Sequence, residues 1–319
     1  MAAADFGKVG FIGLGAMGKP MAQQLATKLP EQSRIYVFDV IEDAVHDFAA
    51  QFPGKVFPEG SAKDVAIKSD IVISMVPEGN HVREVYLNDQ TGICTFDLEK
   101  RIFIDCSTID IATSLEVKQR VTDLHPQASF YDAPVSGGTL GAQKGTISFF
   151  LGCEKDDPHF QFLSELLSLM GKKAIACGGP SFGLASKLCN NYLSGLIAIA
   201  SSEALNIGIR AGLDPRILSS VFAAGTAQNN ICDSWNPCPG VVAEAPSSKD
   251  YQGGFKVQLM KKDFSLAMDL AHSVGARLAL GERGLETYEG ASEDPRCRDL
   301  DSRVVFRYLG GIENWRRRD

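Results

Sequence analysis

The sequence predicts an α/β protein in which a doubly wound parallel sheet is followed by a long helix and an all-helical second half. Two observations carry this prediction. Short apolar runs alternate with helix-period segments up to about residue 178, and the chain then changes to long helical stretches rich in Ala, Leu and Ile. Continuously apolar strands separated by helices are typical of a parallel sheet that is covered on both faces. The 319 residues suffice for two domains, which we place at 1–180 and 181–319.

Six apolar runs are the predicted strands of the first domain. They occupy residues 9–12, 35–38, 71–75, 102–104, 130–131 and 147–151. Helical patterns such as 44–50 and 112–124 lie between them. Each run is short and bounded by polar or turn-forming residues, as expected of buried strands.

The second domain is predicted to be helical throughout. Residues 183–212 contain no proline and read as one helix, which would span about 45 Å at 1.5 Å per residue. Asp214 can cap the next helix, and Pro215 suits its first turn. One loop rich in Pro, Gly and Ser, at 235–254, interrupts the helical remainder.

Composition and charge exclude several kinds of partner. The net charge of −7, without a block of basic residues, argues against nucleic acid and anionic membrane. No apolar run approaches the ~20 residues of a membrane span. The eight cysteines form no C-x-x-C and the five histidines are scattered, so we expect neither a metal site nor disulfides. Residues 1–7 are too few for a targeting peptide, and we expect an intracellular protein with reduced thiols.

A nucleotide-binding turn follows the first predicted strand at once. In a G-x-G-x-x-G segment the first glycine permits a tight turn, the second lets the backbone approach a pyrophosphate, and the third lets helix and strand pack closely. Asp39 ends the second strand, where a carboxylate binds the ribose hydroxyls and repels a 2′-phosphate, so NAD is favoured over NADP. Asp39 could also cap the helix after Ile41, and the two roles are compatible. The sequence therefore predicts a Rossmann-type NAD site whose turn residues are Gly13, Leu14, Gly15, Ala16, Met17 and Gly18.

Two motifs end the strands that follow, where a parallel sheet binds its ligands. In SMVPEGN, we expect Val76 and Pro77 to pack against the adenosine side and Asn80 to reach the cofactor, with an ordinary strand-to-helix turn as the alternative. In DCSTID, Ser107 or Thr108 either faces the same crevice or caps the next helix.

Two further motifs carry polar groups that a purely structural role explains less well. DAPVSGG presents a hydroxyl at Ser136 and two glycines after it, which form either a tight turn or an anion site. In FGLASKLCNN, Lys187 and Asn191 stand at i and i+4 and so share one helix face. A lysine on an apolar helix usually faces solvent, and the alternatives stay open on these residues alone.

Together these motifs resemble those of the β-hydroxyacid dehydrogenase family, over about residues 9–269. The stretch WNPCPGVVAEAPSSKDYQGGF, followed by LMKKD, is similar to the 3-hydroxyisobutyrate dehydrogenase branch of that family. Two positions depart from the family pattern, because Ser181 replaces a usual glycine and Ala16 stands where the family often has Asn.

The resemblance implies a role for each motif. It makes Lys187 the general acid/base, and it makes Asn191 the group that holds the lysine amine or the substrate. Cofactor contacts beyond the glycine-rich turn would come from Asn80, Thr108 and Lys262. Contacts with the substrate carboxylate and its surroundings would come from Ser107, Ser136, Gly137 and Gly138.

The activity that the resemblance implies is NAD-dependent oxidation of 3-hydroxyisobutyrate to methylmalonate semialdehyde, in valine catabolism. In eukaryotes it also implies the mitochondrial matrix, with a cytoplasmic location as the alternative. The helical second half itself suggests an intersubunit surface, so we expect a homodimer or homotetramer. Hydride transfer from a primary alcohol needs a base for the hydroxyl proton, and a lysine serves if desolvation or a nearby cation lowers its pKa. The alternatives are a reductase of another small semialdehyde, of the succinic semialdehyde or glyoxylate type, and a non-catalytic binding protein on the same fold.

Overall fold

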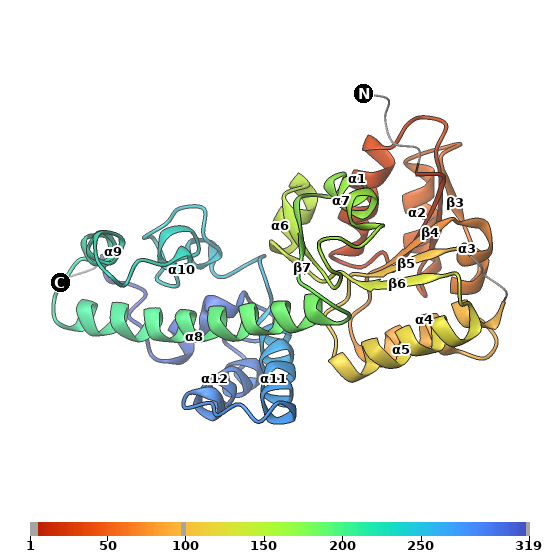
Figure 1. The fold of residues 1–319 in the computed structure, drawn as a ribbon. Helices are drawn as coiled ribbons and strands as arrows, with labels where there is room; N and C mark the ends of the chain where they lie inside the picture. The colour runs from red at the N-terminus through yellow and green to blue at the C-terminus, as the bar shows by residue number, and fades with distance from the viewer. Residues whose placement is uncertain (1–5, 97–99, 317–319) are drawn as a thin grey trace. The chain divides into compact units, whose positions relative to one another are not determined.

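The computed structural model describes residues 6–96 and 100–316. The chain forms two compact units, Met1–Lys187 and Leu188–Asp319, and each is described by itself (Figure 1). Helix α8 (Phe182–Arg210) crosses the division between them. The domain boundary after residue 180 therefore stays a prediction.

The first unit is built on a parallel sheet. Among the described residues its strands are β1 (Lys8–Ile12), β2 (Arg34–Phe38), β3 (Val56–Pro58), β4 (Ile71–Ser74), β5 (Ile102–Asp105) and β6 (Ser129–Asp132). Their order is β3-β2-β1-β4-β5-β6, and every pairing is parallel. This order reverses between β1 and β4, and ligands of such sheets bind at the carboxyl ends of the strands beside that point. The predicted fold class is confirmed, and β3 is the strand of this sheet that the sequence did not predict.

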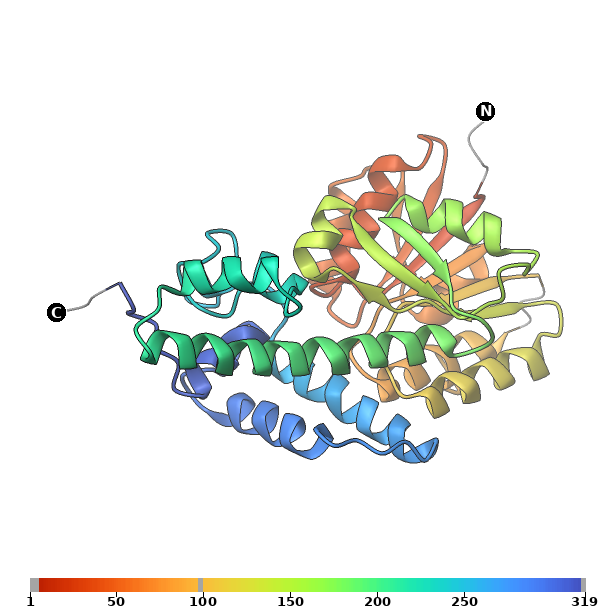
Figure 2. The ribbon, with the colours of Figure 1, turned by 60° about the vertical axis from the view of Figure 1, so that its left-hand side comes forward.

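Successive strand residues point to opposite faces of the sheet, and both faces are covered (Figures 1 and 2). Phe11 and Val37 join an apolar cluster with α1 (Gly18–Lys28), α2 (Glu42–Ala50) and α7 (Phe160–Ser168). Ile12 and Tyr36 join a second cluster with α3 (Ala62–Lys68), α4 (Gly79–Leu87) and α5 (Ile111–Leu124). A short 3-10 turn, η1 (Ile93–Thr95), follows α4. Burial on both faces explains why the strands read as continuous apolar runs.

A small second sheet follows β6. Its strands are β7 (Val135–Ser136), β8 (Ile147–Leu151) and β9 (Gly171–Ala176), with α6 (Gly138–Lys144) between β7 and β8. β7 pairs antiparallel with β8, and β9 pairs parallel with it. The sequence predicted β8 but not β7, which has two residues, nor β9, whose Lys172 and Lys173 interrupt the apolar pattern.

The second unit is helical, as predicted. After α8 come α9 (Pro215–Ala224), α10 (Asn230–Ser234), η2 (Pro246–Lys249), α11 (Val257–Ser273), α12 (Gly281–Glu293), η3 (Ser302–Val304) and α13 (Val305–Tyr308). The Asp214 side chain accepts a hydrogen bond from the Arg216 N–H, so the predicted cap of α9 is confirmed. The core of this unit is formed around Tyr251, Phe264 and Tyr288, which are fully buried.

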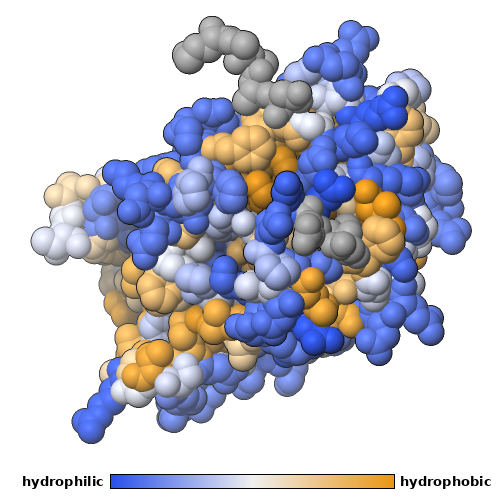
Figure 3. All heavy atoms as spheres, turned by 45° about the vertical axis from the view of Figure 1, so that its right-hand side comes forward, coloured by the Kyte–Doolittle hydropathy of each residue, from blue (hydrophilic) through white to orange (hydrophobic). Residues whose placement is uncertain are grey.

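Helix α8 is long and apolar enough to cross a membrane by length and composition alone, although the sequence analysis found no such run. Core helices of soluble proteins share these properties. Within the second unit, its Ala198 and Leu205 belong to apolar clusters with residues of the loop and helices that follow. On the face drawn in Figure 3, hydrophilic residues predominate and hydrophobic ones form small groups among them.

Candidate active site

The glycine-rich turn between β1 and α1 needs each of its glycines for a different reason. Gly13 has a φ of 93°, and a Cβ on it would lie 2.3 Å from the Met75 carbonyl oxygen. A Cβ on Gly18 would lie 1.8 Å from the Gly13 carbonyl oxygen. A Cβ on Gly15 would meet no protein atom within 4 Å. The protein itself therefore excludes side chains at the first and third glycines, whereas Gly15 borders open space of the kind a pyrophosphate fills.

Asp39 connects the end of β2 to this turn. Its Oδ2 accepts a hydrogen bond from the Leu14 N–H at 2.6 Å, and its Oδ1 accepts one from the Ile41 N–H at 2.9 Å. The local role before α2 thus exists beside the contact with the glycine-rich turn. Each carboxylate oxygen keeps a further lone pair, so the same group can still accept from ribose hydroxyls.

The carboxyl ends of β4 and β5 are joined by a buried network around Asp105. Its Oδ1 accepts hydrogen bonds from Ser74 Oγ at 2.8 Å and from Ser107 Oγ at 2.7 Å. Ser107 Oγ in turn accepts from the Val76 N–H at 3.0 Å. The Ser107 proton is therefore already donated to a carboxylate, which limits what this hydroxyl can offer to an anionic substrate.

Burial raises the pKa of Asp105 to about 6, although hydrogen bonds from Ser107 and Ser74 act in the opposite direction. The Oδ2 atom of this carboxylate is buried without a hydrogen-bond partner. Of the two alternatives for DCSTID, a cap of α5 by Ser107 or Thr108 is wrong, since the Asp110 side chain accepts from the Thr113 N–H at 2.8 Å. Asp110 has the shorter reach to that amide because it directly precedes the helix.

The DAPVSGG segment leads from the end of β6 through β7 to the start of α6. Ser136 ends β7, and Gly137 and Gly138 lead into α6 with φ values of 135° and 63°. A Cβ on Gly138 would meet no atom within 4 Å. Both backbone conformations favour glycine, and the space beside Gly138 leaves its backbone open to a small ligand.

Lys187 and Asn191 lie one turn apart on α8, and both side chains are buried. Within the second unit, Asn191 Nδ2 donates to Asp263 Oδ2 at 2.6 Å, and Asp263 Oδ1 forms an ion pair with Lys262 Nζ at 3.3 Å. One buried carboxylate on α11 therefore fixes both Asn191 and Lys262.

The structure brings the predicted residues together in two groups. The first unit gathers the glycine-rich turn, Asp39 and the ends of β4 and β5. The second unit gathers Asn191 and Lys262 around Asp263. Val76 contributes a backbone contact, while Asn80 is exposed at the start of α4, where its Oδ1 accepts from the His81 N–H. The cofactor contacts of Pro77, Asn80, Thr108 and Lys262 stay predictions.

Besides Asp301, the sequence pattern did not reveal three buried aspartates of the described residues, namely Asp105, Asp132 and Asp263. Each stands within a motif that was quoted, in DCSTID, DAPVSGG and LMKKD respectively. The signal in the sequence was an acidic residue beside an apolar run, which marks a carboxylate that can be buried. A buried carboxylate must be hydrogen-bonded or paired, so such a residue has partners to look for.

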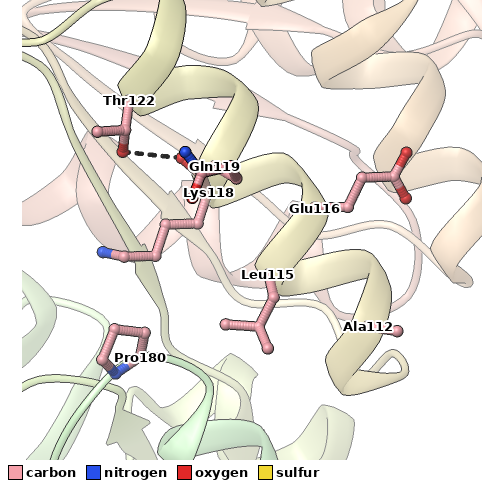
Figure 4. Close-up of a pocket in the computed structure, with 7 residues that line it drawn as sticks. All are labelled: Ala112, Leu115, Glu116, Lys118, Gln119, Thr122 and Pro180. Carbon is pink, nitrogen blue, oxygen red and sulfur yellow. Dashed lines mark hydrogen bonds between the residues drawn. The ribbon is translucent and has the colours of Figure 1, made fainter.

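One shallow hollow lies apart from all the predicted residues (Figure 4). Side chains on the outer face of α5, from Ala112 to Thr122, line it together with Pro180. Thr122 donates from its hydroxyl to the Lys118 carbonyl at 2.9 Å, so this polar group is satisfied within the helix. We assign no role to this hollow.

Comparisons with known proteins agree with this architecture. The sequence profile of the NAD binding domain of 6-phosphogluconate dehydrogenase matches residues 8–179. The profile described as NAD-binding of NADP-dependent 3-hydroxyisobutyrate dehydrogenase matches residues 182–309. The mitochondrial 3-hydroxyisobutyrate dehydrogenase of Homo sapiens is 39% identical over 280 residues, which are 88% of this chain and 80% of the human protein.

The chain belongs to the β-hydroxyacid dehydrogenase family. An NAD-dependent L-serine dehydrogenase of Pseudomonas aeruginosa is 34% identical over 281 residues, covering 88% of this chain and 91% of that protein. The structure of Mycobacterium tuberculosis 3-hydroxyisobutyrate dehydrogenase with L-serine matches with a TM-score of 0.86 and 31% identity, over 96% of this chain and 99% of that one. The protein is thus a 3-hydroxyacid dehydrogenase that uses a nicotinamide dinucleotide.

Proposed function

We propose that this dehydrogenase oxidises 3-hydroxyisobutyrate to methylmalonate semialdehyde with NAD, as a step of valine degradation. The observation that carries the proposal is the pair Lys187 and Asn191, one helical turn apart on α8. The named 3-hydroxyisobutyrate dehydrogenases among the relatives support the substrate.

Lys187 acts in this proposal as the general base. When bound, the nicotinamide ring accepts the hydride that leaves the hydroxymethyl carbon of the substrate. The neutral amine of Lys187 takes the hydroxyl proton and becomes an ammonium group, so the alcohol is left as an aldehyde. Asn191 Nδ2 is bound to Asp263, and its Oδ1 accepts from Asn190 Nδ2 at 3.1 Å. An amide oxygen has a second lone pair, which in this proposal accepts from the lysine or from the substrate hydroxyl.

The substrate carboxylate is held in this proposal by Ser136 and by the backbone at Gly137 and Gly138. The positive φ values of the two glycines and the open space beside Gly138 support this assignment. Ser107 completes the proposed substrate contacts, but it has no hydroxyl proton to offer the substrate carboxylate, since that proton is donated to Asp105.

The cofactor is NAD in this proposal because Asp39 stands at the end of β2. A carboxylate accepts hydrogen bonds from both ribose hydroxyls and repels a 2′-phosphate. The pyrophosphate would lie against Gly15 at the start of α1. Val76, Pro77, Asn80, Thr108 and Lys262 complete the proposed cofactor contacts.

A second candidate substrate is L-serine. One relative is named an L-serine dehydrogenase, and the Mycobacterium tuberculosis structure contains L-serine. Serine and 3-hydroxyisobutyrate share a hydroxymethyl group and a carboxylate, and they differ in an ammonium group against a methyl group. The same reacting groups would serve both, so the side chains around that third substituent decide between them.

The test is a substrate panel followed at the nicotinamide absorbance. Purified protein is assayed with 3-hydroxyisobutyrate, L-serine and larger 3-hydroxy acids, each with NAD and with NADP, and in reverse with methylmalonate semialdehyde, succinic semialdehyde and glyoxylate. We expect the highest kcat/KM with 3-hydroxyisobutyrate and NAD. Faster reduction of succinic semialdehyde or glyoxylate than of methylmalonate semialdehyde would favour the reductase instead, and no turnover of any compound would favour a binding protein.

We also propose that the protein is a homodimer or homotetramer. Large apolar side chains of the second unit are exposed, among them Leu193 at 58%, Ile207 at 68% and Ile217 at 63%. Sedimentation at the single-chain mass of 34.4 kDa would contradict this. In a eukaryotic cell we propose the mitochondrial matrix, and the names of several relatives, which call those proteins mitochondrial, support a location in that organelle. Fractionation of tagged cells tests it.

A further inference from the structure

The first turn of α8 is held by the carboxylate of Asp132, the last residue of β6. Its Oδ1 accepts a hydrogen bond from the Ser181 N–H at 2.8 Å, and its Oδ2 accepts one from the Leu184 N–H at 2.8 Å. Amide groups at the start of a helix have no partner inside the helix, and a carboxylate there is favoured by the helix dipole. Asp132 thus satisfies two such amides in a buried place.

This carboxylate is enclosed by backbone on two sides. A Cβ on Gly152 would lie 1.9 Å from Asp132 Oδ1, and a Cβ on Gly183 would lie 2.7 Å from Asp132 Oδ2. The Cβ on Gly183 would also lie 2.1 Å from the Phe150 carbonyl oxygen. The start of α8 therefore packs directly on the backbone of β8, with the aspartate between them and little room for either to shift.

Asp132 is 2% exposed, so it is not placed to touch a substrate. Lys187 stands three residues after Leu184 on the same helix, about 4.5 Å further along its axis. Because a helix is rigid over one turn, the contact at Leu184 sets the position of the Lys187 backbone. The same strand end leads, four residues later, to Ser136.

We propose that Asp132 is a positioning residue. By fixing the start of α8, it sets the position of Lys187 relative to Ser136 and the two glycines after it, where the substrate carboxylate is proposed to bind. The inference rests on the proposed function, in which Lys187 moves the substrate proton. In this inference Asp132 affects the reaction through the position of Lys187, and it does not itself touch the substrate.

The test is Asp132→Asn, which keeps the volume but offers one oxygen acceptor where two are needed. We expect kcat for 3-hydroxyisobutyrate to fall about 10- to 100-fold, the scale that a small misplacement of a catalytic group costs. The Kd of NAD, measured by fluorescence titration, should stay within about twofold, because the glycine-rich turn makes no contact with Asp132. Asp214→Asn, the same substitution at the residue that caps α9, is the control and should leave kcat unchanged.

A double-mutant cycle separates positioning from a general structural role. If Asp132 acts through Lys187, adding Asp132→Asn to Lys187→Ala should lower the remaining kcat by less than about threefold. An equal loss in both backgrounds would overturn the inference, as would a kcat of Asp132→Asn within twofold of wild type. If neither Asp132→Asn nor Asp132→Ser unfolds cooperatively, the residue serves stability alone and the inference is wrong.

The outcomes for this inference and for the proposed function are distinct. A wild-type protein that oxidises no 3-hydroxy acid, or a Lys187→Ala variant with wild-type turnover, would overturn the proposed function and this inference with it. Where the wild type is active and depends on Lys187, the result with Asp132→Asn decides the inference alone.

Discussion

Asn191 donates a hydrogen bond from its Nδ2 to Asp263 Oδ2 at 2.6 Å, and this contact orients the amide. Asn191→Ala leaves one oxygen of the buried carboxylate without that donor. We expect the free energy of unfolding to fall by about 1–3 kcal/mol, the cost of a buried polar group that loses its partner. Urea titration of the variant, with Glu203→Ala as a control at an exposed position of the same helix, measures this. Equal stability of Asn191→Ala and wild type would mean that the contact contributes nothing to the fold.

Asp39 should decide the choice between NAD and NADP. We expect the wild type to prefer NAD by at least about tenfold in kcat/KM, which corresponds to about 1.4 kcal/mol. Asp39→Arg should erode or reverse that preference, since it removes the repulsion of the 2′-phosphate and adds a cation. Because Asp39 also binds the Leu14 and Ile41 amides, the variant should lose some thermal stability. Equal use of both cofactors by the wild type would contradict the assignment.

Lys187→Ala should abolish most turnover without weakening NAD binding. A positioned acid/base contributes about 10²–10⁴ in rate, and the loss should appear equally in kcat and kcat/KM. The rate of oxidation by wild type should rise with pH as a base deprotonates, and that limb should vanish in the variant. If Lys187→Ala keeps its fold and more than about a third of wild-type turnover, the lysine mechanism is wrong and Lys262 becomes the next candidate.

Ser181 occupies a left-handed backbone conformation with a φ of 62°. Its Oγ donates to Ser114 Oγ at 3.2 Å. Ser181→Gly and Ser181→Ala both remove this hydrogen bond, but only alanine keeps the backbone strain. We expect the glycine variant to be the more stable of the two by about 1 kcal/mol. Chemical denaturation of both variants measures the difference, and an alanine variant at least as stable would show that the strain is relieved.

Asp105 should make stability depend on pH. Its folded-state pKa of about 6 lies above the ordinary value of 3.8, so the folded protein binds a proton more tightly than the unfolded chain. The free energy of unfolding should therefore fall as pH rises from about 4 to about 6, by up to about 3 kcal/mol from this group. Asp105→Asn removes the titrating group and should flatten that decline. Urea titrations at pH 4.5 and 7.5 test this, and the same difference between variant and wild type at both pH values would refute it.

The sequence by itself determined the parallel sheet, the helical second half and the nucleotide turn. Each of these depends on local features, such as apolar runs bounded by turns, a proline-free helical stretch and glycines at fixed spacing after a strand. Gly13, Gly15 and Gly18 could be assigned their roles because a strand, a tight turn and a helix follow one another within a few residues.

Only the tertiary structure decided where the buried carboxylates act. Asp105, Asp132 and Asp263 accept hydrogen bonds from residues that lie 2 to 72 positions away, and no spacing in the sequence records the distant pairings. The short strands β3, β7 and β9 were likewise missed, because two to six residues carry too little periodicity and their pairing depends on neighbours that the fold supplies. Local patterns fix which elements form, whereas buried polar contacts depend on which elements meet, and that is settled by packing over the whole chain.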